Sequence, residues 1–155
     1  DLTFEVTEID IDDDGDYLVS AVVPTAWERD DSLFGTTFEP EDGFGIFTEM
    51  SIDAGCDGVR EPTDWEARLT SPDGYIGQRR RSEDPFVDRP TDDTPGVVMA
   101  WPGFADGIEG AVLRWADDTD RYFVCEFQLG QEDIDLADTF LAACEAARPG
   151  WIPGA

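Results

Sequence analysis

The sequence predicts an α+β fold: an antiparallel sheet of about six or seven strands with a carboxy-terminal helix packed on it, that is, an α/β sandwich. Two observations support this prediction. Several short segments alternate apolar and polar side chains with a period of two and are separated by turn-forming residues. The clearest helical spacing of apolar residues falls near the end of the chain, at 133–148. A length of 155 residues fits a single domain, 1–155.

The amino-terminal residues predict a β-hairpin. An apolar segment from Phe4 to Ile11 and another from Tyr17 to Val23 flank the turn 12–15, which ends in Asp-Gly. Asp-Gly between alternating apolar residues is a strong hairpin signal. Further strands are expected around 35–40 and 45–52.

Two Thr-x-x-Glu patterns are typical of the capping box that begins a helix. The first, at 25–28, predicts a single helical turn, and the second, at 63–66, predicts a short helix that includes 67–69. The prolines and acidic residues of 71–96 indicate the longest irregular stretch of the chain, with a strand within 74–80.

The second half of the chain predicts three strands and the main helix. The strands are expected at 97–101, 109–116 and 121–129, and the helix at 133–148. Acidic residues lie at the start of the helix and Arg148 at its end, as the helix dipole favours. Pro149 and Gly150 then stop it.

The chain has three cysteines, so one of them has no partner within the chain. Cys125 lies on the apolar face of its strand, and Cys144 lies on the apolar side of the last helix. The rise of a helix and of a strand brings both to the same level if the helix folds back along the strand. We therefore expect a Cys125–Cys144 disulfide, with two buried thiols as the alternative. Acidic neighbours disfavour a reactive thiolate at Cys56, so no catalytic role is expected for it.

The charge composition argues against several functions. Ten basic residues, all arginine, stand against 37 acidic ones, and there is no histidine. A Ser-His-Asp or Cys-His site therefore cannot form, and binding to nucleic acid, which needs a basic surface, is not expected. No apolar run is long enough for a membrane span. The net charge of -27 fits a strongly hydrated surface, as in proteins from salty environments, mimicry of nucleic acid toward a basic protein, or cation binding.

Four aspartates near the first turn have the spacing of the first half of an EF-hand calcium loop. They are Asp10, Asp12, Asp14 and Asp16. The EF-hand glutamate is missing, because Ala21 stands at the twelfth position, and predicted strands replace the flanking helices. A hairpin turn is the favoured interpretation, and weak calcium binding by these aspartates is the alternative. No other cofactor is expected.

The run Arg79–Arg81 is the only basic run in the chain. Arginine recognises phosphates and carboxylates well, so the run could bind an anionic group. The favoured interpretation is that it neutralises its acidic neighbours Glu83, Asp84 and Asp88.

The segment Val22-Val23-Pro24-Thr25-Ala26-Trp27 resembles the start of the Mog1/PsbP-like fold, in which a hydrophobic strand is followed by Pro, a small residue and Trp. The order of the later elements is also similar, from a short helix near Trp65 to a carboxy-terminal helix that ends with Cys144. The likeness covers the chain from about Tyr17 onward. The family includes exported bacterial lipoproteins and has no common catalytic residues, so the resemblance implies no site residue here.

These observations predict a non-catalytic binding domain, exported or lipid-anchored outside the cytoplasm, that recognises a protein or a small ligand. A first residue of Asp1 instead of Met fits the removal of a signal peptide, and equally a recombinant start. One alternative is an inhibitor or immunity-type protein of the cell interior whose acidic face blocks a basic partner. Another is a hydrolase that uses carboxylates alone, which needs a cleft where two acids converge and one has a raised pKa.

Overall fold

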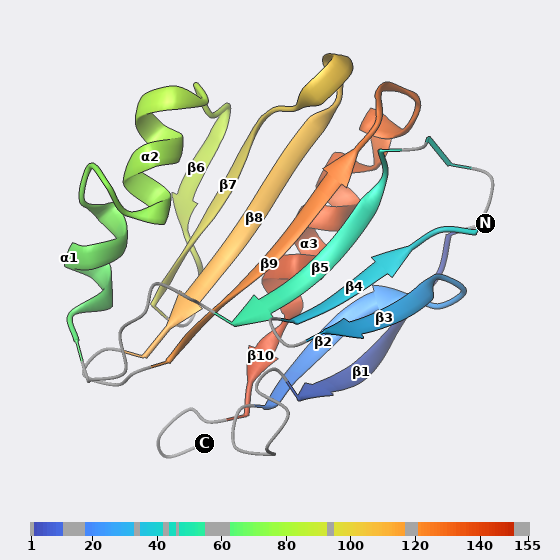
Figure 1. Cartoon of the computed structure of the whole chain (residues 1–155), viewed down its shortest axis with the longest axis horizontal. Helices are drawn as coiled ribbons and strands as arrows, with labels where there is room; N and C mark the ends of the chain where they lie inside the picture. Colours follow the sequence, from blue (N-terminus) through green and yellow to red (C-terminus); the bar gives the residue numbers. More distant parts are fainter. Residues whose placement is uncertain are drawn as a thin grey trace.

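The structure, a computed structural model, describes residues 2–10, 18–32, 35–41, 44–45, 47–54, 63–92, 95–116 and 121–150. The α+β class is confirmed, with a seven-stranded sheet, a three-stranded sheet and a carboxy-terminal helix. Figure 1 shows the large sheet as a curved surface, with the carboxy-terminal helix behind it and two short helices near one edge. No described helix is long and apolar enough to cross a membrane.

The seven-stranded sheet is antiparallel throughout, in the order β3-β4-β5-β9-β8-β7-β6. The strands predicted in the second half of the chain are confirmed as its central members. Its strands are β3 (Glu28–Ser32), β4 (Gly35–Glu39), β5 (Glu49–Ala54), β6 (Val87–Pro90), β7 (Gly96–Pro102), β8 (Ile108–Trp115) and β9 (Tyr122–Leu129).

The three-stranded sheet corrects the expectation of one sheet. The predicted hairpin forms from β1 (Phe4–Asp10) and β2 (Leu18–Pro24), but it stands apart from the seven-stranded sheet. Its third strand, β10 (Arg148–Pro149), pairs antiparallel with the other edge of β2. The hairpin is set by local residues, whereas β10 comes from the far end of the chain, which hydrophobic periodicity does not reveal.

The predicted last helix is divided in the structure. A 3-10 helix, η2 (Gln131–Leu136), leads into the α-helix α3 (Ala137–Ala146). Ala147 already has extended backbone (φ -63°, ψ 139°), so the helix ends before Arg148 instead of at it. The cause is the pairing of the next two residues as β10, together with Pro149, which cannot continue a helix.

Two helices form in the middle of the chain. The predicted short helix is present as α1 (Trp65–Thr70), although its N-cap is Asp64, whose carboxylate accepts a hydrogen bond from the Ala67 N–H at 3.1 Å. The stretch 71–96 is not the irregular region that its prolines suggest, because it holds the helix α2 (Tyr75–Ser82), where a strand was expected. Only Ile76 and Gly77 of α2 are buried, which leaves too short an apolar pattern to distinguish helix from strand.

The first capping pattern is also corrected. Residues 25–27 form a turn and lead directly into β3, where a single helical turn was expected. Pairing of Glu28 with Glu39 of β4 draws this segment into the sheet instead.

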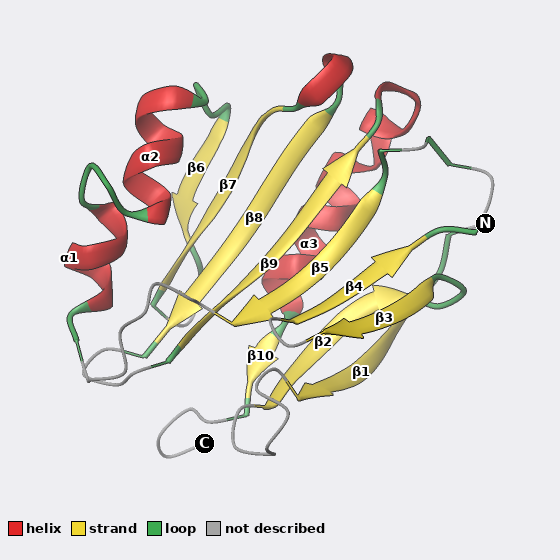
Figure 2. Cartoon of the chain, viewed as in Figure 1, coloured by secondary structure: helices red, strands yellow, loops and turns green. Residues whose placement is uncertain are grey.

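The seven-stranded sheet has two different faces. We call the face under α3 and the three-stranded sheet the inner face, where alternate residues such as Met50, Val112 and Phe127 join one apolar cluster. The opposite, outer face carries a second cluster in which Trp65 of α1 and Ile76 of α2 pack with residues of β7, β8 and β9. Figure 2 shows α3 and the pair α1 and α2 on separate sides of the strands.

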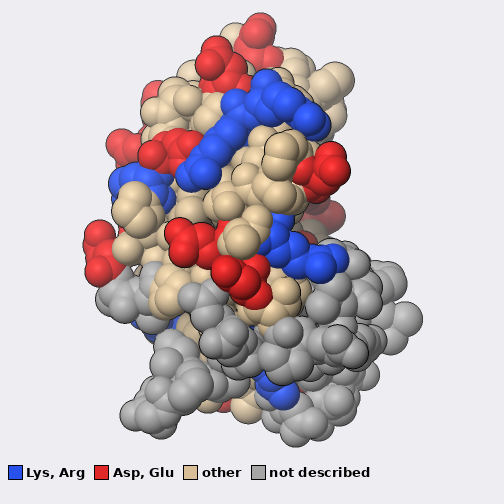
Figure 3. All heavy atoms as spheres, turned by 90° about the vertical axis from the view of Figure 1, so that its left-hand side faces the viewer, with Lys and Arg blue, Asp and Glu red and all other residues tan. Residues whose placement is uncertain are grey.

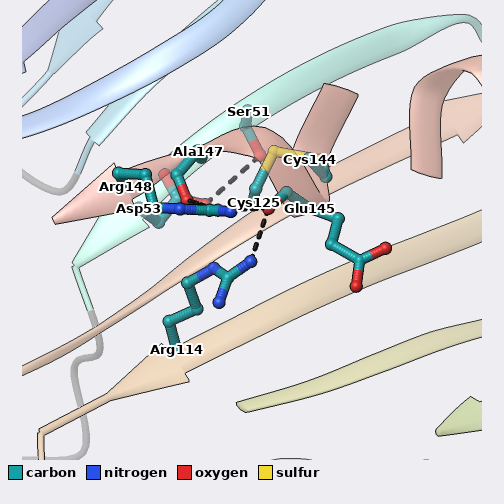
Figure 4. Close-up of a disulfide and its surroundings, with 8 residues drawn as sticks. All are labelled: Ser51, Asp53, Arg114, Cys125, Cys144, Glu145, Ala147 and Arg148. Atoms are coloured by element: carbon teal, nitrogen blue, oxygen red, sulfur yellow. Dashed lines mark hydrogen bonds between the residues drawn. A yellow bond between two sulfur atoms is a disulfide. The ribbon is translucent and has the colours of Figure 1, made fainter. Parts of the chain in front are cut away.

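The predicted disulfide is present on the inner face. Cys125 of β9 and Cys144 of α3 are bonded, with their Cα atoms 5.4 Å apart and both side chains fully buried. Figure 4 shows the bond beside the end of α3, where the side chains of Arg114 and Arg148 donate to the carbonyl of Glu145. Positive charges at a helix carboxyl end are stabilising. Cys56 lies outside the described residues.

Candidate functional site

The outer face of the sheet is covered by helices over only part of its width. The outer apolar cluster contains residues of β7, β8 and β9 but none of β3, β4 or β5. In β5, Met50 and Ile52 are fully buried in the inner cluster, so Glu49, Ser51 and Asp53 face outward. The alternation of the strand therefore brings polar side chains to the part of the outer face that the apolar cluster leaves free.

The register extends this polar surface across neighbouring strands. Glu49 of β5 pairs with Gln128 of β9, which pairs with Glu109 of β8. Ser51 pairs with Glu126 in the next row. Continuing into β4 and β3 gives the set that we call the acidic face: Glu28, Asp30, Glu39, Glu49, Asp53, Glu109 and Glu126.

A cavity of about 130 Å³ lies where the acidic face meets α2. Its lining includes Glu49, Glu109 and Glu126 together with Trp101 and Arg79. The indole N–H of Trp101 donates to Glu109 at 3.1 Å, so one lining side chain of the cavity holds a lining carboxylate in place.

Arg79 is the basic residue among the described residues that line this cavity. Its guanidinium lies 3.9 Å from the ring centre of Tyr75 and 5.6 Å from that of Trp101. The Nε atom of Arg79 is buried and has no hydrogen-bond partner among the described residues. The Tyr75 hydroxyl donates to Glu126, and burial, followed by the charge of Glu126, raises the pKa of Tyr75 well above its usual value. Arg79 is therefore held by aromatic rings beside the carboxylates.

Two carboxyl groups of the acidic face have raised pKa values. Burial, and then the charge of Glu126, raise the pKa of Asp53 to about 6, against the hydrogen bond from Ser51, which lowers it. Burial and the charges of Glu39 and Glu126 likewise raise the pKa of Glu49. Both carboxyl groups are thus easier to protonate than in water, because burial disfavours their charged forms and like charges lie near them.

Carboxylates elsewhere behave differently. The hydrogen bonds that Arg89 donates to Glu145, at 2.8 and 3.0 Å, lower the pKa of that carboxyl group. Arg80 donates to both oxygens of Asp88, at 2.7 and 3.0 Å, which confirms the neutralising role expected of the arginine run for this pair. Figure 3 shows the side of the molecule that carries α1 and α2, where basic side chains form a band with acidic ones around it.

The calcium candidates lie mostly outside the described part of the chain. Asp10 is the last residue of β1, whereas Asp12, Asp14 and Asp16 fall within 11–17, where a turn is predicted and which lies outside the described residues. Within the described residues, no group of three or more Asp, Glu or Cys side chains could hold a metal ion. Weak calcium binding at this turn stays a prediction.

The sequence contains a signal for the acidic face that charge counting alone does not show. Polar residues at every second position, Glu49, Ser51 and Asp53, alternate with apolar ones and predict a wet strand face. The assembly of that face from several strands depends on the sheet order, and Arg79 depends on α2, so neither could be found from the spacing.

No family model matches the chain, and no curated protein matches it. The resemblance to the Mog1/PsbP-like fold accordingly stays a prediction.

Proposed function

We propose that the protein is a non-catalytic binding domain whose acidic face binds a basic segment of a partner protein. The observation that supports this most is the raised pKa of Asp53 and of Glu49. These shifts come first from burial and then from the charges of neighbouring carboxylates, so the folded state holds the ionised groups against both desolvation and mutual repulsion. An approaching arginine or lysine side chain would relieve that repulsion, so binding and charge neutralisation favour each other.

The dimensions of the acidic face favour a polypeptide over a single ion. Its carboxylates come from five adjacent strands, β3 to β8 in sheet order, which at ~4.8 Å per spacing is about 19 Å across. Glu49 and Asp53 are four residues apart on β5, which is about 13 Å along the strand. A basic segment with several cationic side chains can contact such a surface, whereas one small cation can contact only a corner of it.

The compartment in which the protein works belongs to the same proposal. Stable disulfides are typical of proteins outside the cytoplasm, and the Cys125–Cys144 bond supports an exported domain. Mass spectrometry of protein purified from its natural source without reductant should find this bond. Two reduced thiols there would favour an inhibitor of the cell interior instead.

Binding is tested with a synthetic peptide that alternates arginine and serine, titrated by calorimetry. The double variant Glu49→Gln/Asp53→Asn should weaken its affinity by roughly threefold to tenfold. A matched control is Glu5→Gln/Glu8→Gln, which removes two exposed carboxylates of β1 that lie outside the acidic face.

Salt dependence provides the second readout. Affinity for the unaltered protein should fall when ionic strength rises from about 0.05 to about 0.5 M, because salt screens exposed charges. If the two double variants bind the peptide equally, or if affinity is flat across this range, the acidic face is not the binding surface.

A second candidate function is hydrolysis by carboxylates alone, which one observation favours. Asp53, with a pKa of about 6, lies close enough to Glu126 for the charge of Glu126 to contribute to that raised value. Two such groups can serve as general acid and base. Turnover of a panel of chromogenic glycosides near pH 6, abolished in Asp53→Asn, would support it. No turnover at any pH would exclude this substrate class.

A further inference from the structure

An exposed aromatic pair stands at one end of the molecule. Phe104 is 68% exposed and Phe47 is 36% exposed, and their ring centres are 5.1 Å apart in an edge-to-face arrangement. Phe104 belongs to the 3-10 turn η1 (Phe104–Asp106) between β7 and β8, whereas Phe47 precedes β5. Two large apolar side chains from distant segments thus meet at the surface, where Phe104 above all lacks the burial that usually fixes such residues.

The backbone that presents Phe104 is strained. Ala105 (φ 54°) and Asp106 (φ 62°) both adopt the left-handed conformation, which costs free energy in residues other than glycine. The turn is tied down at its base, because the Gly103 N–H donates to the Gly107 carbonyl at 2.9 Å. An added Cβ on Gly107 would lie only 2.2 Å from the Leu129 carbonyl oxygen, so the turn rests directly on the end of β9.

The pair lies next to the acidic face. Phe47 is two residues before Glu49, and Gly103 is so close to Glu109 that an added Cβ would lie 3.1 Å from the Cγ atom of that residue. Glu49 and Glu109 lie in one row of the sheet, with Gln128 between them. The aromatic pair therefore lies next to this row, at one end of the acidic face.

We infer that the Phe47–Phe104 pair is the apolar anchor of the binding surface, and that the partner is a basic segment carrying an apolar side chain at one end. The inference rests on the proposed function of the acidic face. Charge complementarity selects this occupant. Asp106 lies in the same turn as Phe104, and Glu49 and Glu109 line the neighbouring cavity of the acidic face. These carboxylates attract a basic polypeptide and repel an anionic lipid surface.

Two peptides separate the anchor from the charges. The first alternates arginine and serine, and the second is the same peptide with a leucine at one end. Calorimetry with the full chain should give tighter binding of the leucine peptide, by roughly tenfold for one buried leucine. Phe104→Ser should remove this difference, so that the variant binds both peptides with equal affinity. Phe86→Ser is the matched control, because Phe86 is 56% exposed and belongs neither to the aromatic pair nor to the acidic face.

Each outcome is decisive. Equal affinity of the two peptides, or a leucine advantage that survives Phe104→Ser, overturns the anchor and leaves the proposed function intact. If neither peptide binds, the proposed function fails and the inference fails with it. Concentration-dependent dimerisation that disappears in Phe104→Ser, measured by sedimentation without peptide, would assign the pair to a second copy of the chain and overturn the inference. Thermal melting of each variant confirms that it is folded.

Discussion

The two faces of the seven-stranded sheet are built from the same strands but differ in chemistry, because the inner face is apolar and part of the outer face is acidic. On the inner face, β5 and β9 contribute Ile52, Cys125 and Phe127 to one apolar cluster under α3. On the outer face, the same strands contribute Glu49, Asp53 and Glu126, whose charges repel one another. The inner face therefore supplies stability, and part of the outer face is held at a cost in stability. A surface kept against its own repulsion is a better functional candidate than an acidic composition alone.

The inner face is tested most strongly at Phe140. This fully buried ring of α3 lies 5.5 Å from Trp27 and 5.7 Å from both Phe4 and Phe127, measured between ring centres. Phe140→Ala should lower the free energy of unfolding by about 4 kcal/mol, because it removes apolar contacts and leaves a cavity. Urea denaturation measures the change, and Phe86→Ala, on an exposed ring, should change it by less than about 1 kcal/mol.

The disulfide of the inner face should have the next largest effect. Cys125 and Cys144 are 19 residues apart in sequence, and closing a loop of this size restricts the unfolded chain. Cys125→Ala/Cys144→Ala should lower the free energy of unfolding by about 3 kcal/mol. Reduction of the unaltered protein provides the comparison in the same denaturation assay. A loss below about 1 kcal/mol would mean that packing alone holds α3 on β9.

The buried carboxylate of Asp133 differs from those of the acidic face because hydrogen bonds from neighbouring groups stabilise it. Asp133, 8% exposed, accepts hydrogen bonds from the Thr48 hydroxyl at 2.5 Å and from the Gly45 N–H at 2.8 Å. Thr48 in turn accepts from the Gly130 N–H at 3.1 Å. Asp133→Ala should cost about 2 kcal/mol because it leaves buried donors unsatisfied. Asp138→Ala, at an exposed position of α3, should stay within about 0.5 kcal/mol.

Removing a charge from the acidic face should raise the free energy of unfolding, whereas the substitutions at Phe140, the disulfide and Asp133 should lower it. Asp53 has a pKa of about 6 in the folded protein and 3.8 as its ordinary value, so the folded state binds the proton more tightly. Stability from this group is greatest below pH 3.8 and falls as pH rises to about 6. Asp53→Asn should therefore raise the free energy of unfolding at pH 7 by about 1 kcal/mol, a value reduced for solvent screening of a partly exposed group.

The pH dependence checks the cause of that gain. The difference in melting temperature between Asp53→Asn and the unaltered protein should shrink as pH falls from about 6 toward 3.8. Asp138→Asn serves as the control for removing a carboxylate outside the acidic face. A gain that does not depend on pH would mean that the ionisation of Asp53 is not what the variant relieves.

Much of this architecture follows from local signals in the sequence. The β1–β2 hairpin, the strands around Val112 and Cys125 and the disulfide are confirmed, because alternation and turn residues act over short distances. The sequence pattern does not predict α2, because this helix buries only Ile76 and Gly77. It does not predict β10 either, because the partner residue Ser20 is far away in the chain.

The candidate site was only partly predictable. The outward alternation of Glu49 with Met50 can be read from β5 alone. The assembly of the acidic face depends on β9 lying between β5 and β8, an order that no local pattern specifies. The meeting of Phe47 and Phe104 depends on the same order, so the aromatic pair could not be foreseen either.

The pairing of β10 with β2 also bears on how the chain folds. The β1–β2 half of the small sheet closes a short loop and can form early, whereas the β10 half joins Arg148 to Ser20, across most of the chain. Contacts of such long sequence separation slow folding, because chain entropy must be lost before they form. Once α3 is fastened to β9 at Cys144, however, Arg148 is only four residues away. Formation of the Cys125–Cys144 bond should therefore speed the last step of folding, because it brings β10 closer to its partner strand β2.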